Sequence, residues 1–77
     1  MRVFDGKKFQ AIRGSRSLED LIYLFRTKNL KVSYGTLMKY EAGKISPRGN
    51  YLVQMADILG VSVDDFFTEV EDPVSVS

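Results

Sequence analysis

Apolar residues recur at helical spacing in several short segments of this chain. The clearest segment is residues 17–27, where apolar side chains follow the i, i+3, i+4, i+7 pattern of an amphipathic helix: Leu18, Leu21, Ile22 and Phe25. No segment alternates apolar and polar residues over more than a few positions, as a half-buried strand would. The pattern predicts an all-α fold, a compact bundle of five short helices.

Polar cap residues and glycines mark where these helices begin and end. Residues whose side chains can accept a hydrogen bond from a first helical turn stand at Asp5, Ser17, Ser33, Ser46 and Ser62. Ser46 is followed by a proline, which is favoured at the first helical position. Glycines in helix-ending positions stand at Gly14, Gly43 and Gly60. These signals predict helices over residues 5–14, 17–27, 33–43 and 46–60, and a short fifth helix from Ser62.

The apolar stripes also predict the core and the extent of the domain. Phe4 and Phe9 are spaced as a hydrophobic staple, and Ile45 is expected to point inward. We expect residues 1–69 to form one domain and residues 70–77 to be a flexible acidic tail or an added dimer contact. The residues expected only in the core are Leu37, Tyr40, Leu52, Met55 and Leu59.

The charges are unevenly distributed along the chain, although the net charge is only +1. Residues 1–49 hold all 11 Lys and Arg and four acids, a net charge of +7, whereas residues 50–77 hold six acids and no base, a net charge of −6. A basic half favours a polyanionic partner, and two solvated faces of opposite sign are equally consistent with charge alone.

The composition excludes several classes of function. The chain has neither Cys nor His, which removes the usual zinc ligands and the usual His-based or Cys-based catalysis. There is no Gly-rich phosphate loop, and Asp64-Asp65 is better explained as first-turn charge at a helix start. We therefore expect no enzyme and no cofactor.

Without a membrane span or signal peptide, a cytoplasmic, nucleoid-associated protein is expected.

Residues 32–43, VSYGTLMKYEAG, have the character of a recognition helix. A cap opens the segment, two apolar residues give it an inner face, and its other face carries small, polar and basic residues. Preceded by another helix and a turn, this is a helix-turn-helix pattern, whose second helix fits the major groove of DNA. Six cations surround it against one acid, Glu41, a local net charge of +5: Arg26, Lys28, Lys31, Lys39, Lys44 and Arg48.

The run from Ser33 to Phe67 resembles the lambda-repressor-like (Cro/cI, XRE) helix-turn-helix family. The matching motifs are VSYGTLMKYEAG, with Glu41-Ala42-Gly43 at its end, then Pro47, and then ADILGVS over residues 56–62. The stretch SLEDL at residues 17–21 resembles the opening of the family's second helix. The resemblance implies a five-helix domain that binds a double-stranded DNA operator, usually as a symmetric homodimer, and regulates transcription, here as an expected repressor.

The resemblance also implies roles for individual residues. An ion pair between Arg13 and Glu41 is expected to be structural. Three of the residues named below also have a simpler structural explanation. Gly35 would only let the helix approach closely, and Tyr34 would pack on the preceding turn. Ser46 would only cap its helix. The base-reading positions would be Tyr34, Gly35, Thr36 and Lys39, and the phosphate-binding positions Arg16, Ser17, Lys28, Lys31, Ser33, Lys44, Ser46 and Arg48.

The chain departs from the family pattern in two places. The turn of a helix-turn-helix is short, and from Leu21 to Val32 this chain is about five residues longer than the family's pattern. Either the second helix is extended or the connection is a longer loop. In addition, Leu18 stands where the family often has a Gln that binds a phosphate. Arg16 or Ser17 would then supply the phosphate contact that Leu18 cannot make.

A different class of function is a protein-interaction module or an antitoxin built on a helix-turn-helix domain. Its acidic half would bind a protein partner, but it would have no reason to keep Lys39, Lys44 and Arg48 on one face. A regulatory protein partner is also compatible with the DNA-binding interpretation. The candidate dimer surface consists of apolar residues near the C-terminus: Val63, Phe66, Phe67, Val70 and Val74. The alternative is that Phe66 or Phe67 completes the core of the monomer.

Overall fold

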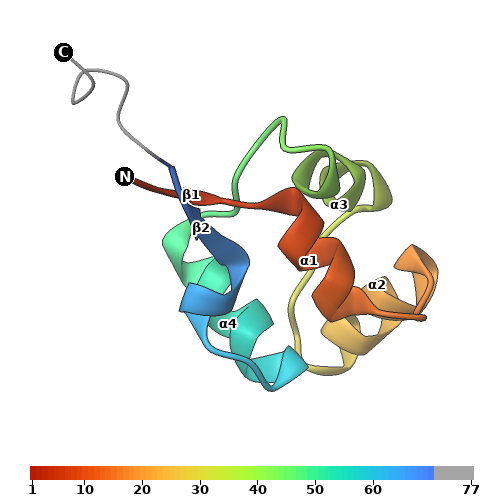
Figure 1. Cartoon of the computed structure of the whole chain (residues 1–77). Coiled ribbons are helices and arrows are strands. Elements are labelled where there is room, and N and C mark those ends of the chain that lie inside the picture. Colours follow the sequence, from red (N-terminus) through yellow and green to blue (C-terminus); the bar gives the residue numbers. More distant parts are fainter. Residues whose placement is uncertain (71–77) are drawn as a thin grey trace, which may run out of the picture.

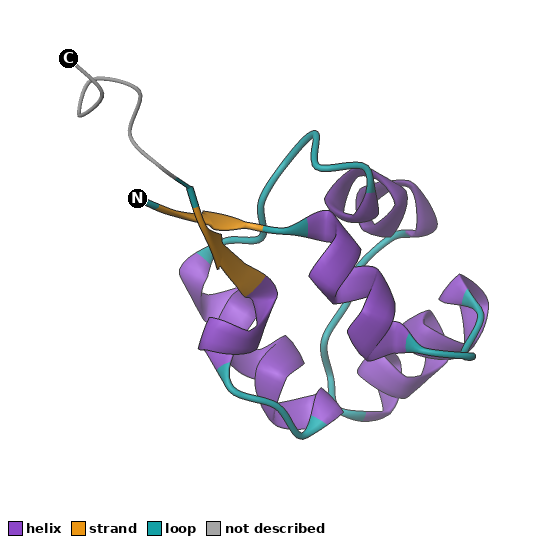
Figure 2. Ribbon diagram, viewed as in Figure 1, coloured by secondary structure: helices purple, strands orange, loops and turns teal. Residues whose placement is uncertain are grey.

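Four α-helices and a small antiparallel sheet make up the fold in the computed structural model, which describes residues 1–70 (Figures 1 and 2). The sheet joins the two ends of the described chain, because its strands come first and last in the order of elements. The order is β1 (Arg2–Phe4), α1 (Gly6–Arg13), α2 (Leu18–Thr27), α3 (Tyr34–Glu41), α4 (Gly49–Leu59), the 3₁₀ helix η1 (Val63–Phe66) and β2 (Phe67–Glu69).

The prediction of five α-helices is wrong at the last helix. Four residues of 3₁₀ helix stand there, opened by a hydrogen bond from the Ser62 amide to the Asp65 carboxylate at 3.0 Å. The chain then turns directly into β2, which pairs with β1 in the register Arg2↔Glu69 and Phe4↔Phe67. Three-residue strands are too short to show an alternating pattern, which is why the sequence pattern did not indicate them.

The cap residues predicted for the first three helices are confirmed. The side chains of Asp5, Ser17 and Ser33 accept hydrogen bonds from backbone amides in the first turns of α1, α2 and α3. The third helix ends as expected, because Gly43 follows its last turn with a φ of +75°, a conformation that glycine adopts without steric cost. Local chemistry therefore sets the limits of the helix of greatest interest.

The predicted start of the fourth helix is wrong. α4 begins at Gly49, with Arg48 rather than Ser46 in the N-cap position, and Arg48 makes no side-chain cap bond. Pro47 lies outside the helix with its ring buried, so it anchors the loop instead of opening the helix. Ile45 was expected to point inward but is 42% exposed, which is also a correction.

The core lies where the helices meet, and aromatic rings form its centre. Phe9 and Phe66 are fully buried with ring centroids 5.8 Å apart, and Phe4 lies 6.0 Å from Phe9 and 6.1 Å from Phe66. The Phe4–Phe9 staple is therefore confirmed. Burial raises the pKa of the Tyr40 hydroxyl, which keeps this core residue neutral. Of the residues expected only in the core, Leu37, Tyr40, Leu52 and Met55 are buried and Leu59 is partly buried.

The candidate dimer surface is changed by this packing. Phe66 belongs to the monomer's core and is not available to a partner, whereas Val63 and Phe67 are only partly buried. Val70 is 38% exposed and its amide donates to the Met1 carbonyl at 2.7 Å. Val74 and the predicted tail beyond residue 70 lie outside the described residues, so the domain boundary remains a prediction.

Candidate nucleic-acid interface

The N-terminal end of α3 is set by a pair of hydroxyl side chains. The Thr36 amide donates to the Ser33 hydroxyl at 3.1 Å, and the two hydroxyl oxygens lie 2.8 Å apart. Leu37 and Tyr40 bury the inner side of the helix. Thr36 is partly buried and already bonded to Ser33, so its hydroxyl is less free to read a base than the sequence prediction supposed.

Helix α1 holds the other end of α3 at two points. The Arg13 guanidinium forms two hydrogen bonds with the Glu41 carboxylate, at 2.6 and 3.1 Å, and these side chains are only 17% and 12% exposed. At Gly6, the start of α1 passes so close to α3 that an added Cβ would lie 2.4 Å from the Glu41 carbonyl oxygen. The expected structural ion pair is confirmed, and the close approach at Gly6 is a feature that the sequence did not indicate.

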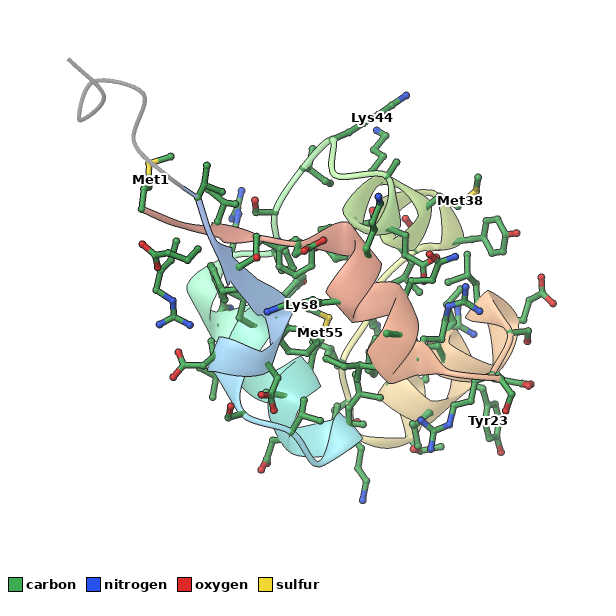
Figure 3. All side chains as sticks on the ribbon, in the orientation of Figure 1. Met1, Lys8, Tyr23, Met38, Lys44 and Met55 are labelled. Atoms are coloured by element: carbon green, nitrogen blue, oxygen red, sulfur yellow. The ribbon has the colours of Figure 1, made fainter. Side chains whose placement is uncertain are left out.

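The outward side of α3 carries the exposed residues. Tyr34 is 46% exposed, Lys39 is exposed, and Gly35 has open space where a Cβ would stand. Met38 is 51% exposed on the same side and points away from the body of the molecule in Figure 3. Sequence reasoning missed Met38, although its spacing of three from Gly35 places the two on one helical face.

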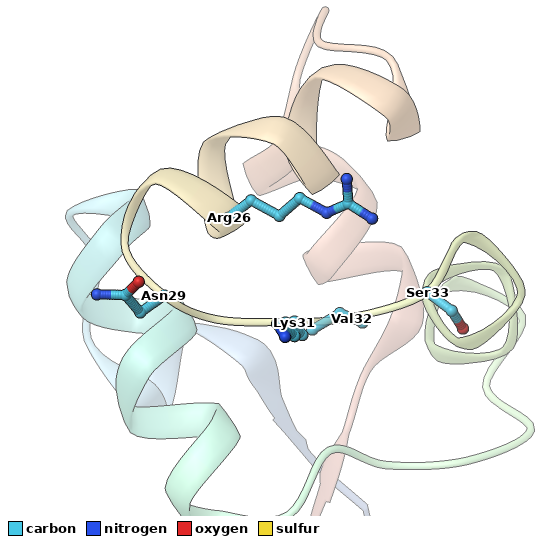
Figure 4. A pocket seen from close by; sticks show the side chains of 5 residues that line it. All are labelled: Arg26, Asn29, Lys31, Val32 and Ser33. Carbon is cyan, nitrogen blue, oxygen red and sulfur yellow. The ribbon is translucent and has the colours of Figure 1, made fainter.

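The connection between α2 and α3 is the longer loop of the two alternatives. α2 ends at Thr27, so Arg26 remains on the helix, and Leu30 and Val32 fix the loop by burying their side chains, 2% and 7% exposed. Beside the start of α3, this loop borders an open hollow of about 710 Å³, lined by Arg26, Asn29, Lys31, Val32 and Ser33. Figure 4 shows the side chains of these five residues. Lys28 and Lys31 are both exposed on the loop.

The remaining predicted phosphate-binding residues stand in two further segments. Lys44, Ser46 and Arg48 are exposed on the loop after α3, and Lys44 lies near its tip in Figure 3. Because Arg48 is the N-cap of α4, Ser46 has no capping role and its hydroxyl is exposed. At the start of α2, Arg16 and Ser17 are exposed, but the Ser17 hydroxyl already accepts a hydrogen bond from the Asp20 amide.

The electrostatics around α3 are more strongly positive than the residue count indicates. Glu41, the one acid in the group, is neutralised by Arg13. Within residues 1–70, no ion pair involves any of the six surrounding cations: Arg26, Lys28, Lys31, Lys39, Lys44 and Arg48. An exposed helix ringed by uncompensated cations attracts a polyanion.

Comparison with known protein families identifies the architecture. A family model described as helix-turn-helix, of the Cro/cI (XRE) type, matches residues 28–66, just over half of the chain. The chain belongs to this helix-turn-helix family. Its members are DNA-binding transcriptional regulators, so double-stranded DNA is the partner that the family implies. A search of curated proteins and a search of solved structures returned no match.

The helix-turn-helix match begins in the loop between α2 and α3 and continues through α3, the loop after it and α4 to the end of η1. α2 lies outside the matched range and is assigned as the first helix of the motif by its position before α3. Among the described residues, no three acidic side chains gather closely enough to hold a metal ion. No helix in residues 1–70 combines the length and the apolar character needed to cross a bilayer.

Proposed function

We propose that this helix-turn-helix protein is a sequence-specific repressor that binds its operator as a symmetric homodimer, with α3 in the major groove. The observation that carries the proposal is the outward side of α3, which is exposed and surrounded by cations without ion pairs in residues 1–70. A major groove admits one α-helix, and phosphates on either side of it supply the complementary charge.

Base reading is assigned to the exposed residues of α3. Lys39 donates to the acceptor atoms O6 and N7 of guanine, and Tyr34 contacts a base or a phosphate from the first turn. Gly35 allows the helix to approach the bases closely, because no side chain intervenes. Thr36 has a smaller part, since its hydroxyl is bonded to Ser33.

Phosphate binding is assigned to three segments around α3. The loop after α3 contributes Lys44, Ser46 and Arg48, and the longer connection contributes Lys28 and Lys31. Arg16, Ser17 and Ser33 flank the starts of α2 and α3, where backbone amides add to the attraction for an anion. These contacts position the protein on the duplex but carry no sequence information.

The experiment that tests this proposal is selection of bound duplexes from a random DNA pool, followed by sequencing. Enrichment of a palindrome with half-sites about one helical turn apart supports operator reading by a symmetric dimer. A single, non-repeated site would retain sequence-specific binding and contradict the dimer. Binding without enrichment that collapses in moderate salt would contradict sequence reading and favour a protein partner.

Replacing Lys39 with alanine is expected to weaken operator binding by about 1–3 kcal/mol and to relax the preference at one base pair. Lys39 is exposed and makes no ion pair within residues 1–70, so its loss should not disturb the fold. The measurement is the dissociation constant for the selected operator and for single-base variants of it.

Arg48→Ala is the matched control for Lys39→Ala, because Arg48 is exposed and its side chain makes no cap bond to α4. This variant should weaken all duplexes by a similar factor and make the salt dependence shallower by about one unit. Equal weakening of all sequences by Lys39→Ala would show that Lys39 contacts a phosphate and not a base.

A further inference from the structure

The outward side of α3 contains a shallow hollow around Met38, an exposed residue to which the proposed function assigns no role. Its volume is about 290 Å³, and Gly35, Met38, Lys39, Ala42 and Lys44 line it. The four helical positions follow one face, at i, i+3, i+4 and i+7. Gly35 has no side chain, and a Cβ added there would meet nothing within 4 Å, so the space beside Met38 is open on that side.

Apolar and cationic residues meet in this hollow. Met38 is 51% exposed, and the residues that line the hollow also include Lys39 and Lys44. Exposed apolar side chains are common singly, but this one lies in a hollow on α3, the helix that the proposed function places in the major groove. Methionine is flexible and polarisable, so it adapts to the shape of an apolar group that enters such a hollow.

The two lysines among the lining residues indicate what enters the hollow. Lysine is depleted in the buried centres of protein–protein interfaces, whereas it is the ordinary partner of DNA phosphates and guanine edges. The major-groove edges of the bases present an apolar group at thymine, its C5-methyl. A methyl group is small enough to enter a hollow between Gly35 and Ala42 and contact the Met38 side chain.

We propose that Met38 is a specificity-determining residue that recognises a thymine through its C5-methyl group, in the hollow between Gly35 and Ala42. This inference rests on the proposed function, because it requires α3 to lie in the major groove. It adds an apolar contact to the polar contact assigned to Lys39. The selected half-site is therefore expected to contain a thymine on the side of α3 where Met38 projects.

The test replaces each thymine of the selected operator, one at a time, with deoxyuridine, which removes only the methyl group. For the unmodified protein, one thymine in each half-site should show a loss of about fourfold in affinity, the value expected for one methyl group returned to water. Met38→Ala should abolish this difference between thymine and uracil at that position. Met38→Leu keeps an apolar side chain and should retain the difference.

Val53→Ala is the control, because it truncates another exposed apolar side chain, on α4 and outside this hollow, and should leave the discrimination between thymine and uracil intact. Because Met38 is exposed, Met38→Ala is expected to leave the thermal midpoint unchanged. Measuring the thermal midpoint of each variant confirms that folded proteins are compared.

Three results would overturn the inference. If Met38→Ala retains the penalty for uracil, another residue recognises the methyl group. If no thymine shows a penalty in the unmodified protein, no methyl group is recognised, although the selected operator still supports the proposed function. If no duplex is selected at all, the proposed function fails and this inference fails with it.

Discussion

Replacing Phe66 with alanine is expected to lower the free energy of unfolding by about 3–5 kcal/mol, the usual cost of truncating a buried aromatic side chain. The ring is fully buried, 5.8 Å from the ring of Phe9 and 6.1 Å from that of Phe4. The Phe66 carbonyl also accepts a hydrogen bond from the Asp5 amide at 2.7 Å. The residue therefore joins the C-terminal part of the domain to α1 and to the strand before it.

Such a loss is a large fraction of the stability of a 77-residue chain, which is about 4–12 kcal/mol at typical values per residue. Urea unfolding followed by circular dichroism measures it directly. Val53→Ala is the control, because Val53 is 60% exposed and its truncation should change stability by less than about 0.5 kcal/mol. Equal stability of the two variants would contradict the buried position of Phe66.

Replacing Gly6 with alanine is expected to destabilise the domain by up to about 3 kcal/mol, although alanine is the better helix former. The added Cβ would lie 2.4 Å from the Glu41 carbonyl oxygen and 2.6 Å from that of Tyr40. These are backbone atoms at the end of α3, so no side-chain rotation relieves the contact. α1 and α3 must move apart, and that movement also strains the pair between Arg13 and Glu41.

The effect on DNA binding distinguishes Gly6 from an ordinary core position. Because α1 fixes the end of α3 at Gly6 and at Arg13, the variant should bind the operator more weakly even at temperatures where it is folded. Gly49→Ala is the matched control, since a Cβ there meets nothing within 4 Å. It should leave the thermal midpoint unchanged or slightly higher. A Gly6→Ala protein as stable as the Gly49→Ala protein would contradict this close approach of α1 to α3.

Features that depend on local chemistry were predicted correctly. The caps at Asp5, Ser17 and Ser33 need only a side-chain oxygen two or three residues before a free amide. The end of α3 at Gly43 needs only a residue that adopts a positive φ. In the candidate interface, the same local signals located the start of α3 and its exposed Lys39.

Predictions failed where burial decides between two locally acceptable arrangements. Ser46-Pro47 has the local chemistry of a helix start, but Pro47 is buried and α4 begins after it. Ile45 was expected inside because it is apolar, but it is exposed, as is Met38 on α3. Hydrophobicity favours burial without requiring it, because the core has room for only some of the apolar side chains.

The sequence by itself determined that this protein has short capped helices, a third helix that is capped by Ser33 and ends before Gly43, and a basic N-terminal half. These properties follow from interactions between residues a few positions apart. Only the tertiary structure decided that the chain ends pair as a sheet, that a 3₁₀ helix takes the place of a fifth α-helix, and that α1 meets α3 at Gly6. The sheet pairing and the approach at Gly6 join residues 34 to 67 positions apart, and no local pattern encodes which of the many distant contacts the packed core selects.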